Sequence, residues 1–558
     1  MKSCDAMTAR HFDVFRARVL AAIAIGAILT PPALARTATT TASTRAGAPA
    51  TATAPATALG PGVPIAPALV HHPVSTLVPR AQQAFDEGLT LVYAFNRDEA
   101  RKRFEYAAAL DPKLAIAWWG VALAVGPNIN FGIDAERLVT ASAAIARARA
   151  LASNGTPVER ALIDALARRY PGRANAPTEP GYRAYRDAMR GVHEAYRGDD
   201  DVATLFAESV MDSDGWTWTD GELDAPGRSI RTALDGVLAH DPGHVGANHY
   251  YIHLMDAEGV AARGVASAER LSMLHVEPAA SHLLHMSGHI YLDVGRFTDL
   301  ERDNRIAVDD DRVYAATLGT KPTELDYYRH NLDFYTGGAV MLDDRIEKER
   351  AVGFLREIQS ADALLVAARD GHFADVLAAP HVAATASFHE RAIDLYARAI
   401  ASAARGDVRR AQIETDAYDA LLRLESSAVA GRFNIYYAAL GKLAAARVAH
   451  ASGDDDTATS LLREAIAATK SLPPEAFPVW FFPAGEWLGW IELRRGNAVA
   501  AERAFRDDLA RTPHNARAIF GLMESLGHQG RAIEAGPLAY DIVAHWRGPL
   551  ANLRVATP

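Results

Sequence analysis

Two widely separated segments of this chain carry the same spacing of small, aromatic and proline residues. The recurring residues are Gly88, Ala100, Phe104, Ala107 and Pro112, and then Gly489, Ala501, Phe505 and Pro513. Small residues let two antiparallel helices approach, the aromatic ring fills the gap between them, and proline ends the second helix. The spacing therefore predicts a helix-turn-helix unit of about 34 residues that recurs along the chain.

This pattern resembles the tetratricopeptide repeat family, and looser copies of it fill much of the sequence between the two clear units. We expect an all-α fold, a right-handed superhelical solenoid of tetratricopeptide-type helix-turn-helix repeats. The first helices line the concave surface in that family. The resemblance therefore implies a groove lined by the first helix of each unit.

Four shorter motifs make the resemblance more specific. They are Trp119-Gly120 with Gly126-Pro127-Asn128-Ile129-Asn130, then His285-Met286-Ser287-Gly288-His289-Ile290-Tyr291, then Tyr327-Tyr328-Arg329-His330-Asn331, and finally Phe505-Arg506-Asp507-Asp508-Leu509. They are similar to motifs of bacterial exported tetratricopeptide repeat proteins that have a His-Met-x-x-His helix. A second histidine often follows the His-Asn pair in that group, where this chain has Asp333. The resemblance implies a fold and motifs, and no reaction.

The N-terminal region reads as an export signal followed by a tether. Basic residues precede the apolar run from Val19 to Leu29, and Ala33-Leu34-Ala35 is typical of a cleavage site. We expect a signal peptide over residues 1–35, cut after Ala35, and a periplasmic or secreted protein. Residues 36–75 are rich in Ala, Thr and Pro and are expected to be disordered. The predicted divisions that follow are an N-terminal repeat array over 76–340, a C-terminal array over 341–548 and a tail over 549–558.

Composition excludes several classes of site and partner. Cys4 is the only cysteine and lies in the expected signal, so the exported chain has no disulfide and no thiolate ligand. The net charge is −10, which argues against nucleic acid as a partner. No later apolar run reaches the ~20 residues of a spanning helix, so we expect no membrane insertion.

Histidines cluster in the middle of the chain. Eight of the twenty fall between His240 and His289, and His330 follows closely. The repeat phase places His249 and His253 one turn apart on one first helix, and His282, His285 and His289 on the next. His330 and Asp333 lie on a helix expected over 324–335. Glu208 takes an equivalent place on a helix expected over 202–212.

This arrangement is typical of a metal site. Histidines at i and i+4 on one helix can bind a single ion, and neighbouring helices complete the coordination shell. We predict metal ligands among His249, His253, His282, His285, His289, His330, Glu208 and Asp333. Without thiolates, a transition metal such as Zn, Cu or Fe is expected.

Three functions remain open from the sequence. The first is an exported solenoid whose histidine-rich, metal-binding groove takes a peptide, protein or small ligand. The second is a metalloenzyme, hydrolytic or oxidative, in which the ion activates water or oxygen. The third is a metal-free scaffold for protein interaction. No nucleophile elbow, phosphate-binding loop or dinucleotide fingerprint supplies catalytic or cofactor-binding residues.

Overall fold

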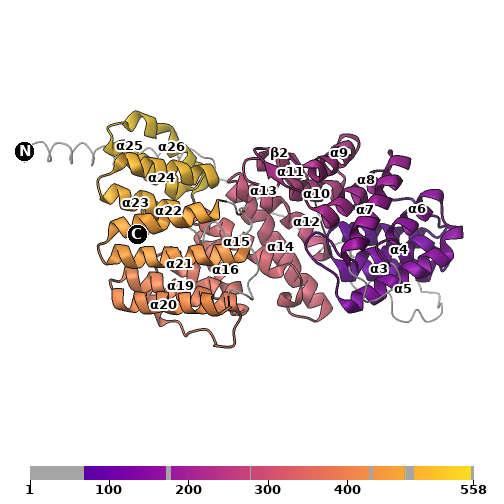
Figure 1. The fold of residues 1–558 in the computed structure, drawn as a ribbon, viewed down its shortest axis with the longest axis horizontal. Coiled ribbons are helices and arrows are strands. Elements are labelled where there is room, and N and C mark those ends of the chain that lie inside the picture. The colour runs from indigo at the N-terminus through magenta and orange to yellow at the C-terminus, as the bar shows by residue number, and fades with distance from the viewer. Residues whose placement is uncertain are drawn as a thin grey trace, which may run out of the picture.

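The fold is a row of helical hairpins, each made of two antiparallel helices. The computed structural model describes residues 68–170, 178–274, 276, 278–425, 432–470, 472 and 483–553. Consecutive hairpins stack side by side along an elongated molecule (Figure 1). If α12 and α13 are taken as one interrupted helix, the described residues form twelve hairpins. The expected all-α repeat solenoid is confirmed.

The first helices of the hairpins are α2 (Pro79–Tyr93), α4 (Ala115–Ala124), α6 (Pro157–Leu166), α8 (Asp200–Asp214), α10 (Val245–Met255), α12 (Ser281–His285) with α13 (Ser287–Asp293), α15 (Tyr328–Leu342), α17 (Asp362–Arg369), α19 (Phe388–Ala404), α21 (Arg432–Ala451), α23 (Ala484–Arg494) and α25 (Ala516–His528). The second helices are α3 (Arg97–Leu110), α5 (Ala135–Leu151), α7 (Thr178–Ala195), α9 (Ala225–His240), α11 (Val265–Ser272), α14 (Phe297–Leu318), α16 (Arg345–Glu357), α18 (Phe373–Ala378), α20 (Val408–Glu425), α22 (Asp455–Thr469), α24 (Ala498–Arg511) and α26 (Ala532–His545). Short 3-10 helices cover Ala152–Asn154, Ala261–Gly264, Pro278–Ala280, Pro322–Glu324 and Leu550–Leu553.

Glycine and phenylalanine hold neighbouring hairpins together. Phe104 on α3 is fully buried, and its ring fills the space that a Cβ on Gly88 or Gly120 would need. A Cβ on Gly88 of α2 would lie 2.8 Å from that ring, and one on Gly120 of α4 would lie 2.3 Å from it. Phe505 occupies the same place between Gly489 and Gly521 at the other end of the molecule. The recurring residues thus fix the distance between successive first helices.

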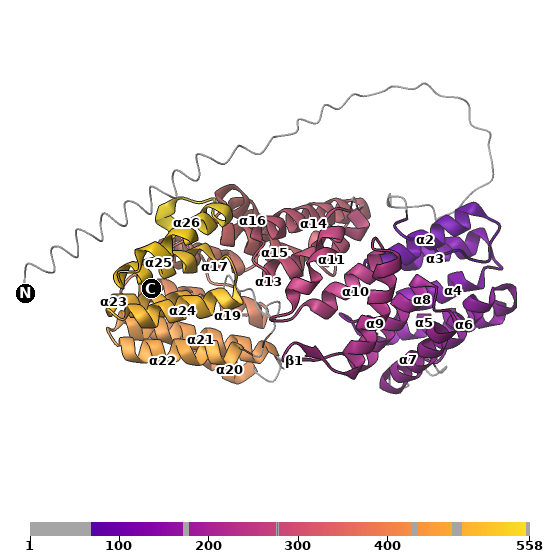
Figure 2. The same ribbon diagram turned by 90° about the horizontal axis from the view of Figure 1, so that it is seen from above.

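The C-terminal hairpins turn back onto the middle of the solenoid (Figure 2). The backbone N–H of Arg547 donates to the carbonyl of Leu342 at 2.8 Å, and Arg369 pairs with Glu486 at 2.6 Å. One core cluster runs from Val70 to Ala504. The expected division at residue 340 therefore falls inside α15 and marks no break in the core.

The expected terminal boundaries also need correction. Residues 68–75, assigned to the tether, are ordered, because His72 bonds Asp201 and Ser75 donates to Glu159. The expected tail includes the 3-10 helix Leu550–Leu553, whose last side chain is buried. The expected signal peptide and most of the expected tether lie outside the described residues.

Two connecting segments differ in character. The long connection after α8 holds a small antiparallel hairpin of β1 (Trp218–Thr219) and β2 (Glu222–Leu223). The segment from Asp309 to Leu318, by contrast, is regular helix and forms the second half of α14. Its Asp311 is buried, because the helix packs that side against α12 and α15.

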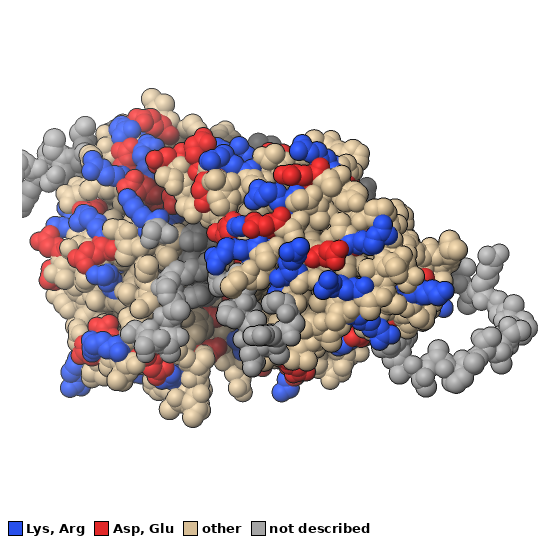
Figure 3. All heavy atoms as spheres, turned by 45° about the vertical axis from the view of Figure 1, so that its right-hand side comes forward, with Lys and Arg blue, Asp and Glu red and all other residues tan. Residues whose placement is uncertain are grey.

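Surface charge is mixed, and the described helices are not of a membrane-spanning kind. Lys and Arg alternate with Asp and Glu over the face drawn in Figure 3. None of the described helices combines the length and the apolar character that crossing a bilayer requires.

The close packing of Phe104 predicts that one methyl group added at Gly120 lowers the stability of the fold. Gly120→Ala forces the buried ring against its neighbours and should destabilise the N-terminal hairpins by about 1–3 kcal/mol. Thermal unfolding followed by circular dichroism measures this. Gly191→Ala on α7 is the control, since nothing lies within 4 Å of its added Cβ. Equal melting temperatures for the two variants would contradict the packing.

Candidate metal centre

Six histidines from three successive hairpins meet in the middle of the solenoid. Their ligand nitrogens fall into two sets, and those within each set lie within 4.8 Å of one another. The first trio is His249, His253 and His282, and the second trio is His285, His289 and His330. The rings come from α10, α12, α13 and α15, which neighbour one another near the centre of Figures 1 and 2.

The first trio is built on the end of α2. Tyr93 is the last residue of that helix, so its carbonyl lacks a helical partner. His249 Nδ1 lies 2.6 Å from this oxygen and donates to it, which leaves a lone pair on Nε2. That Nε2 lies 3.1 Å from His253 Nε2. Neither ring nitrogen of buried His282 has a hydrogen-bond partner among the described residues.

Phe95 packs against the first trio in a strained backbone conformation. Its φ is +55°, a left-handed value that costs a bulky residue about 1–2 kcal/mol. Its ring centroid lies 4.4 Å from that of His249, 6.0 Å from His253 and 5.5 Å from His282. Strain of this kind persists where surrounding packing compensates for it. The Phe95 ring thus packs against all three imidazoles of the first trio.

The second trio has the same construction. His285 and His289 place their Nε2 atoms 3.1 Å apart, and His330 Nε2 lies 3.4 Å from His289 Nε2. Phe334 is the counterpart of Phe95, with its centroid 4.7 to 4.9 Å from all three rings. Three nitrogens bound to one tetrahedral ion at 2.0–2.1 Å would lie roughly 3.3 Å apart, close to these spacings.

Hydrogen bonds on the far side of two rings of this trio, His285 and His289, fix their tautomers. His289 Nδ1 donates to Asp256 at 2.8 Å, and His285 Nδ1 donates to the Asn304 side-chain oxygen at 2.6 Å. The Asn304 amide is oriented by its own donation to the Leu300 carbonyl. Both Nε2 atoms therefore carry lone pairs and face each other at 3.1 Å, where a shared metal ion would relieve their repulsion.

Burial favours the neutral form of five of these rings, His249, His253, His282, His285 and His330. It lowers the pKa of His249 and of His330 to about 3, and the neighbouring His289 adds a smaller effect. Burial and then the neighbouring histidines hold the pKa values of His253, His282 and His285 well below the usual range. Neutral imidazole is the form that binds metal.

Asp311 connects the helices that carry the site. Its carboxylate accepts from Ser281 Oγ at 2.6 Å and from Asn331 Nδ2 at 2.7 Å. Burial raises its pKa to about 7, although these two hydrogen bonds oppose the change. Because Ser281 begins α12 and Asn331 follows His330 on α15, this contact sets the spacing of the two helices.

A pocket of about 420 Å³ opens beside the first trio. His282 and Asp311 line it together with Arg97, Arg101, Lys102 and Tyr327. The Tyr327 ring stacks on that of His282 at 3.9 Å, and its hydroxyl accepts from Asn130. A small ligand in this pocket would reach His282.

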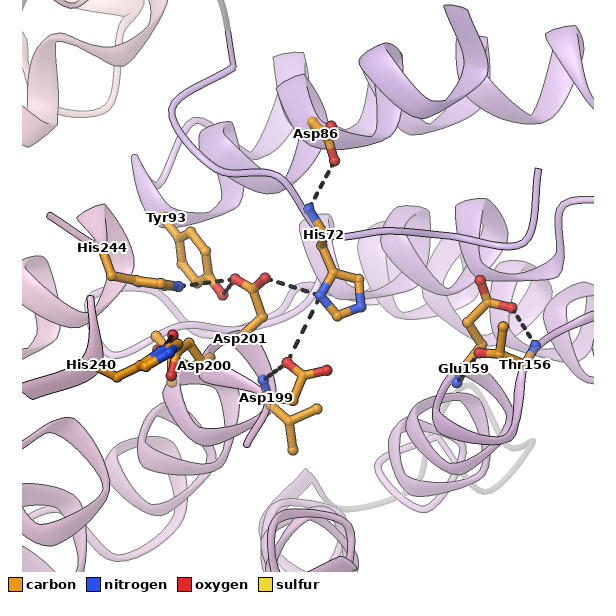
Figure 4. A network of polar contacts seen from close by, with 12 residues as sticks. His72, Asp86, Tyr93, Thr156, Glu159, Asp199, Asp200, Asp201, His240 and His244 are labelled. Carbon is orange, nitrogen blue, oxygen red and sulfur yellow. Dashed lines mark hydrogen bonds and ion pairs between the residues drawn. The ribbon is translucent and has the colours of Figure 1, made fainter. Parts of the chain in front are cut away.

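A separate network anchors the helices beneath the first trio (Figure 4). Asp201 accepts from the Tyr93 hydroxyl at 2.7 Å, from His72 at 3.0 Å and from His244 at 3.2 Å. Burial favours protonation of Asp201, but hydrogen bonds from His244 and His72 outweigh it and hold its pKa below the usual range. His72, Asp199 and Asp201 lie close enough to share an ion. Since donors already occupy Asp201, we interpret this group as structural.

One further group lies near the C-terminus. His514 and His545 stack with centroids 4.2 Å apart, and each Nδ1 faces the carboxylate of Asp541. The three side chains are partly exposed. This open arrangement matches an ordinary surface ion pair and a weak cation site equally well.

Two of the expected ligands point elsewhere. Glu208 on α8 is buried beside Asp212, which pairs with Arg169. Burial and then the Asp212 charge raise the pKa of Glu208 well above its usual value. Asp333 on α15 faces Asp362 and His389, and burial followed by the Asp362 charge raises its pKa to about 8. Neither residue supplies a ligand atom to the trios.

The residues that orient the rings were not predicted from the sequence. Asn304 and Asp256 stand outside any motif, and the Tyr93 carbonyl carries no side-chain signal. The motif over residues 126–130 gave an indirect sign, because its Asn130 bonds the tyrosine that stacks on His282. The expected single helix through His282 and His289 is interrupted at Met286, between α12 and α13.

Comparisons with known proteins identify only distant structural similarities. No family model matches the chain, and no curated protein sequence matches it. Similar solved structures include the crystal structure of yeast Tom70, at 10% identity over 81% of this chain and 90% of that one, with a TM-score of 0.27. The P58(IPK) TPR domain matches at 12% identity over 81% and 99%, with a TM-score of 0.23. The Naa15/Naa10 complex bound to HypK-THB matches at 12% identity over 84% and 70%, with a TM-score of 0.20.

The depressed pKa values of the buried histidines predict acid sensitivity. Unfolded chain takes up protons below pH 6.5 at these rings, whereas His249 and His330 in the fold resist protonation down to about pH 3. Each should cost roughly 2 kcal/mol of stability at pH 5, and the loss should be absent above pH 7. The melting temperature of metal-free protein should fall from pH 7.5 to 5.0, and fall less steeply in a His249→Gln/His330→Gln variant. Parallel curves would contradict the assigned burial.

Proposed function

We propose that this exported repeat protein binds a transition-metal ion through imidazoles contributed by three successive hairpins. The observation that carries the proposal is the pair of Nε2 lone pairs on His285 and His289, 3.1 Å apart, with both Nδ1 atoms already donating. Hydrogen bonds to carboxylate, amide and carbonyl oxygens are the usual support of metal-binding histidines. Zn, Cu and Fe(II) all accept imidazole ligands.

Purely structural histidines would explain less of this arrangement. A packed core histidine normally satisfies both ring nitrogens, because an unpaired buried polar atom costs about 1–3 kcal/mol. His282 satisfies neither nitrogen within the described residues, and the inner nitrogens of the second trio face one another. Ion binding would compensate for that cost.

Element analysis of untagged protein tests the proposal. Protein recovered from the periplasm or medium should begin at Arg36 and carry at least half an equivalent of a transition metal. A variant with Gln at positions 249, 253, 285 and 289 should carry none. The matched control replaces His71 and His240, which are largely exposed, with Gln and should keep the metal. Native protein without metal would leave only a helical interaction scaffold.

The pocket beside His282 supports a metalloenzyme as a second candidate. Three protein nitrogens leave a position for water or substrate, which is the arrangement of catalytic rather than structural zinc sites. Its lining carries both signs of charge, from Arg97, Arg101 and Lys102 and from Asp98, Asp311, Glu324 and Asp326, and the pocket would give a small ligand such as an anion access to that open position. Azide should therefore perturb the visible spectrum of copper- or cobalt-loaded protein. A spectrum that azide leaves unchanged would indicate a closed site with a storage or structural role.

A further inference from the structure

The six histidines form two complete sets rather than one. The ligand atoms that lie within 4.8 Å of one another separate into the first trio and the second trio. Each trio has an i, i+4 pair whose Nε2 atoms are 3.1 Å apart, and each adds one ring from another helix. Each also packs on its own phenylalanine, Phe95 or Phe334. The two trios therefore share one arrangement: an i, i+4 histidine pair, a third histidine and a packed phenylalanine.

We propose that the chain holds two metal ions side by side, one in each trio. This inference rests on the proposed function and extends it to a dinuclear centre. His282 and His285 belong to different trios but to one turn of α12, and their rings stack at 5.5 Å. His253 and His289 face each other across the same boundary at 6.2 Å. The two ions are therefore immediate neighbours.

The charges around the two trios narrow the choice of metal. All six ligands are imidazoles, which bind metal without a charge of their own, and Asp256 is the only carboxylate hydrogen-bonded to one of their rings within the described residues. Paired iron or manganese ions in helical proteins are usually held by bridging carboxylates, which these trios lack. Imidazole-only coordination suits copper and zinc.

Repulsion between the two metal ions favours ions of low charge, or an anion that lies between them. Coulomb energy scales with the product of the charges, so two dications repel about four times as strongly as two monocations at the same distance. Neutral rings do nothing to offset that repulsion. The pair is therefore a copper(I) pair, or a dication pair that takes a small inorganic anion between the two ions.

Copper reconstitution of the metal-free full-length chain tests the inference. Wild-type protein should bind two coppers per chain after gel filtration. His249→Gln/His253→Gln and His285→Gln/His289→Gln should each bind one, because each variant removes two ligands from one trio. All counts are repeated in a His514→Gln/His545→Gln background, which removes the exposed C-terminal group as a source of extra copper.

Electron paramagnetic resonance of the copper(II) protein tests whether the ions are neighbours. Each single-trio variant should give an ordinary isolated signal, and the wild type should give a broadened or weakened one. A wild-type spectrum equal to the sum of the two variant spectra would overturn the dinuclear arrangement. Loss of both coppers in either variant would overturn the assignment of one ion to each trio.

The copper count also separates this inference from the proposed function. One copper per wild-type chain overturns the dinuclear centre and leaves a metal-binding protein, whereas no copper overturns both. Circular dichroism verifies that each variant folds. If a double variant fails to fold, the single substitutions His253→Gln and His330→Gln replace it, because these two rings are not fully buried; each should cause the same loss of one copper.

Discussion

Close helix approach at glycine is the constraint on which both the solenoid and its histidine site depend. Gly88 and Gly120 admit the Phe104 ring between two hairpins. The same device operates beside the histidines, where a Cβ on Gly246 would lie 2.5 Å from the Tyr93 ring and one on Gly288 would lie 2.4 Å from Asn304 Nδ2. The Tyr93 carbonyl and the Asn304 side-chain oxygen accept the Nδ1 hydrogens of His249 and His285, so these glycines bring two of the ring-orienting groups within reach.

The packing of the repeats, rather than a special loop, therefore sets the geometry of the site. Ring-bearing helices are successive first helices of the solenoid, and their separation is set by hairpin packing. Buried polar contacts such as Asp311 with Ser281 and Asn331 then fix the register of the neighbouring helices. A site built this way is preorganised, because its histidines lie on packed helices.

Much of this was predictable from the sequence, and the reasons are specific. The residue spacings that begin at Gly88 and at Gly489 predicted the helical hairpins, because closely packed antiparallel helices need small residues at their contact and an aromatic ring in the gap. Helical period placed His249 beside His253 and His285 beside His289, since i and i+4 share a face. Contacts between distant helices escaped prediction. Asp333 lies one turn from His330, yet α15 directs it toward Asp362, and no local pattern reveals which neighbour a helix face meets.

Anomalous X-ray scattering from crystals grown without added metal tests the central claim most directly. The account predicts a transition-metal peak about 2.0–2.1 Å from the Nε2 atoms of the second trio. Well-ordered imidazole rings with no metal peak between them would contradict it. Imidazoles that turn toward separate surfaces would contradict it as well.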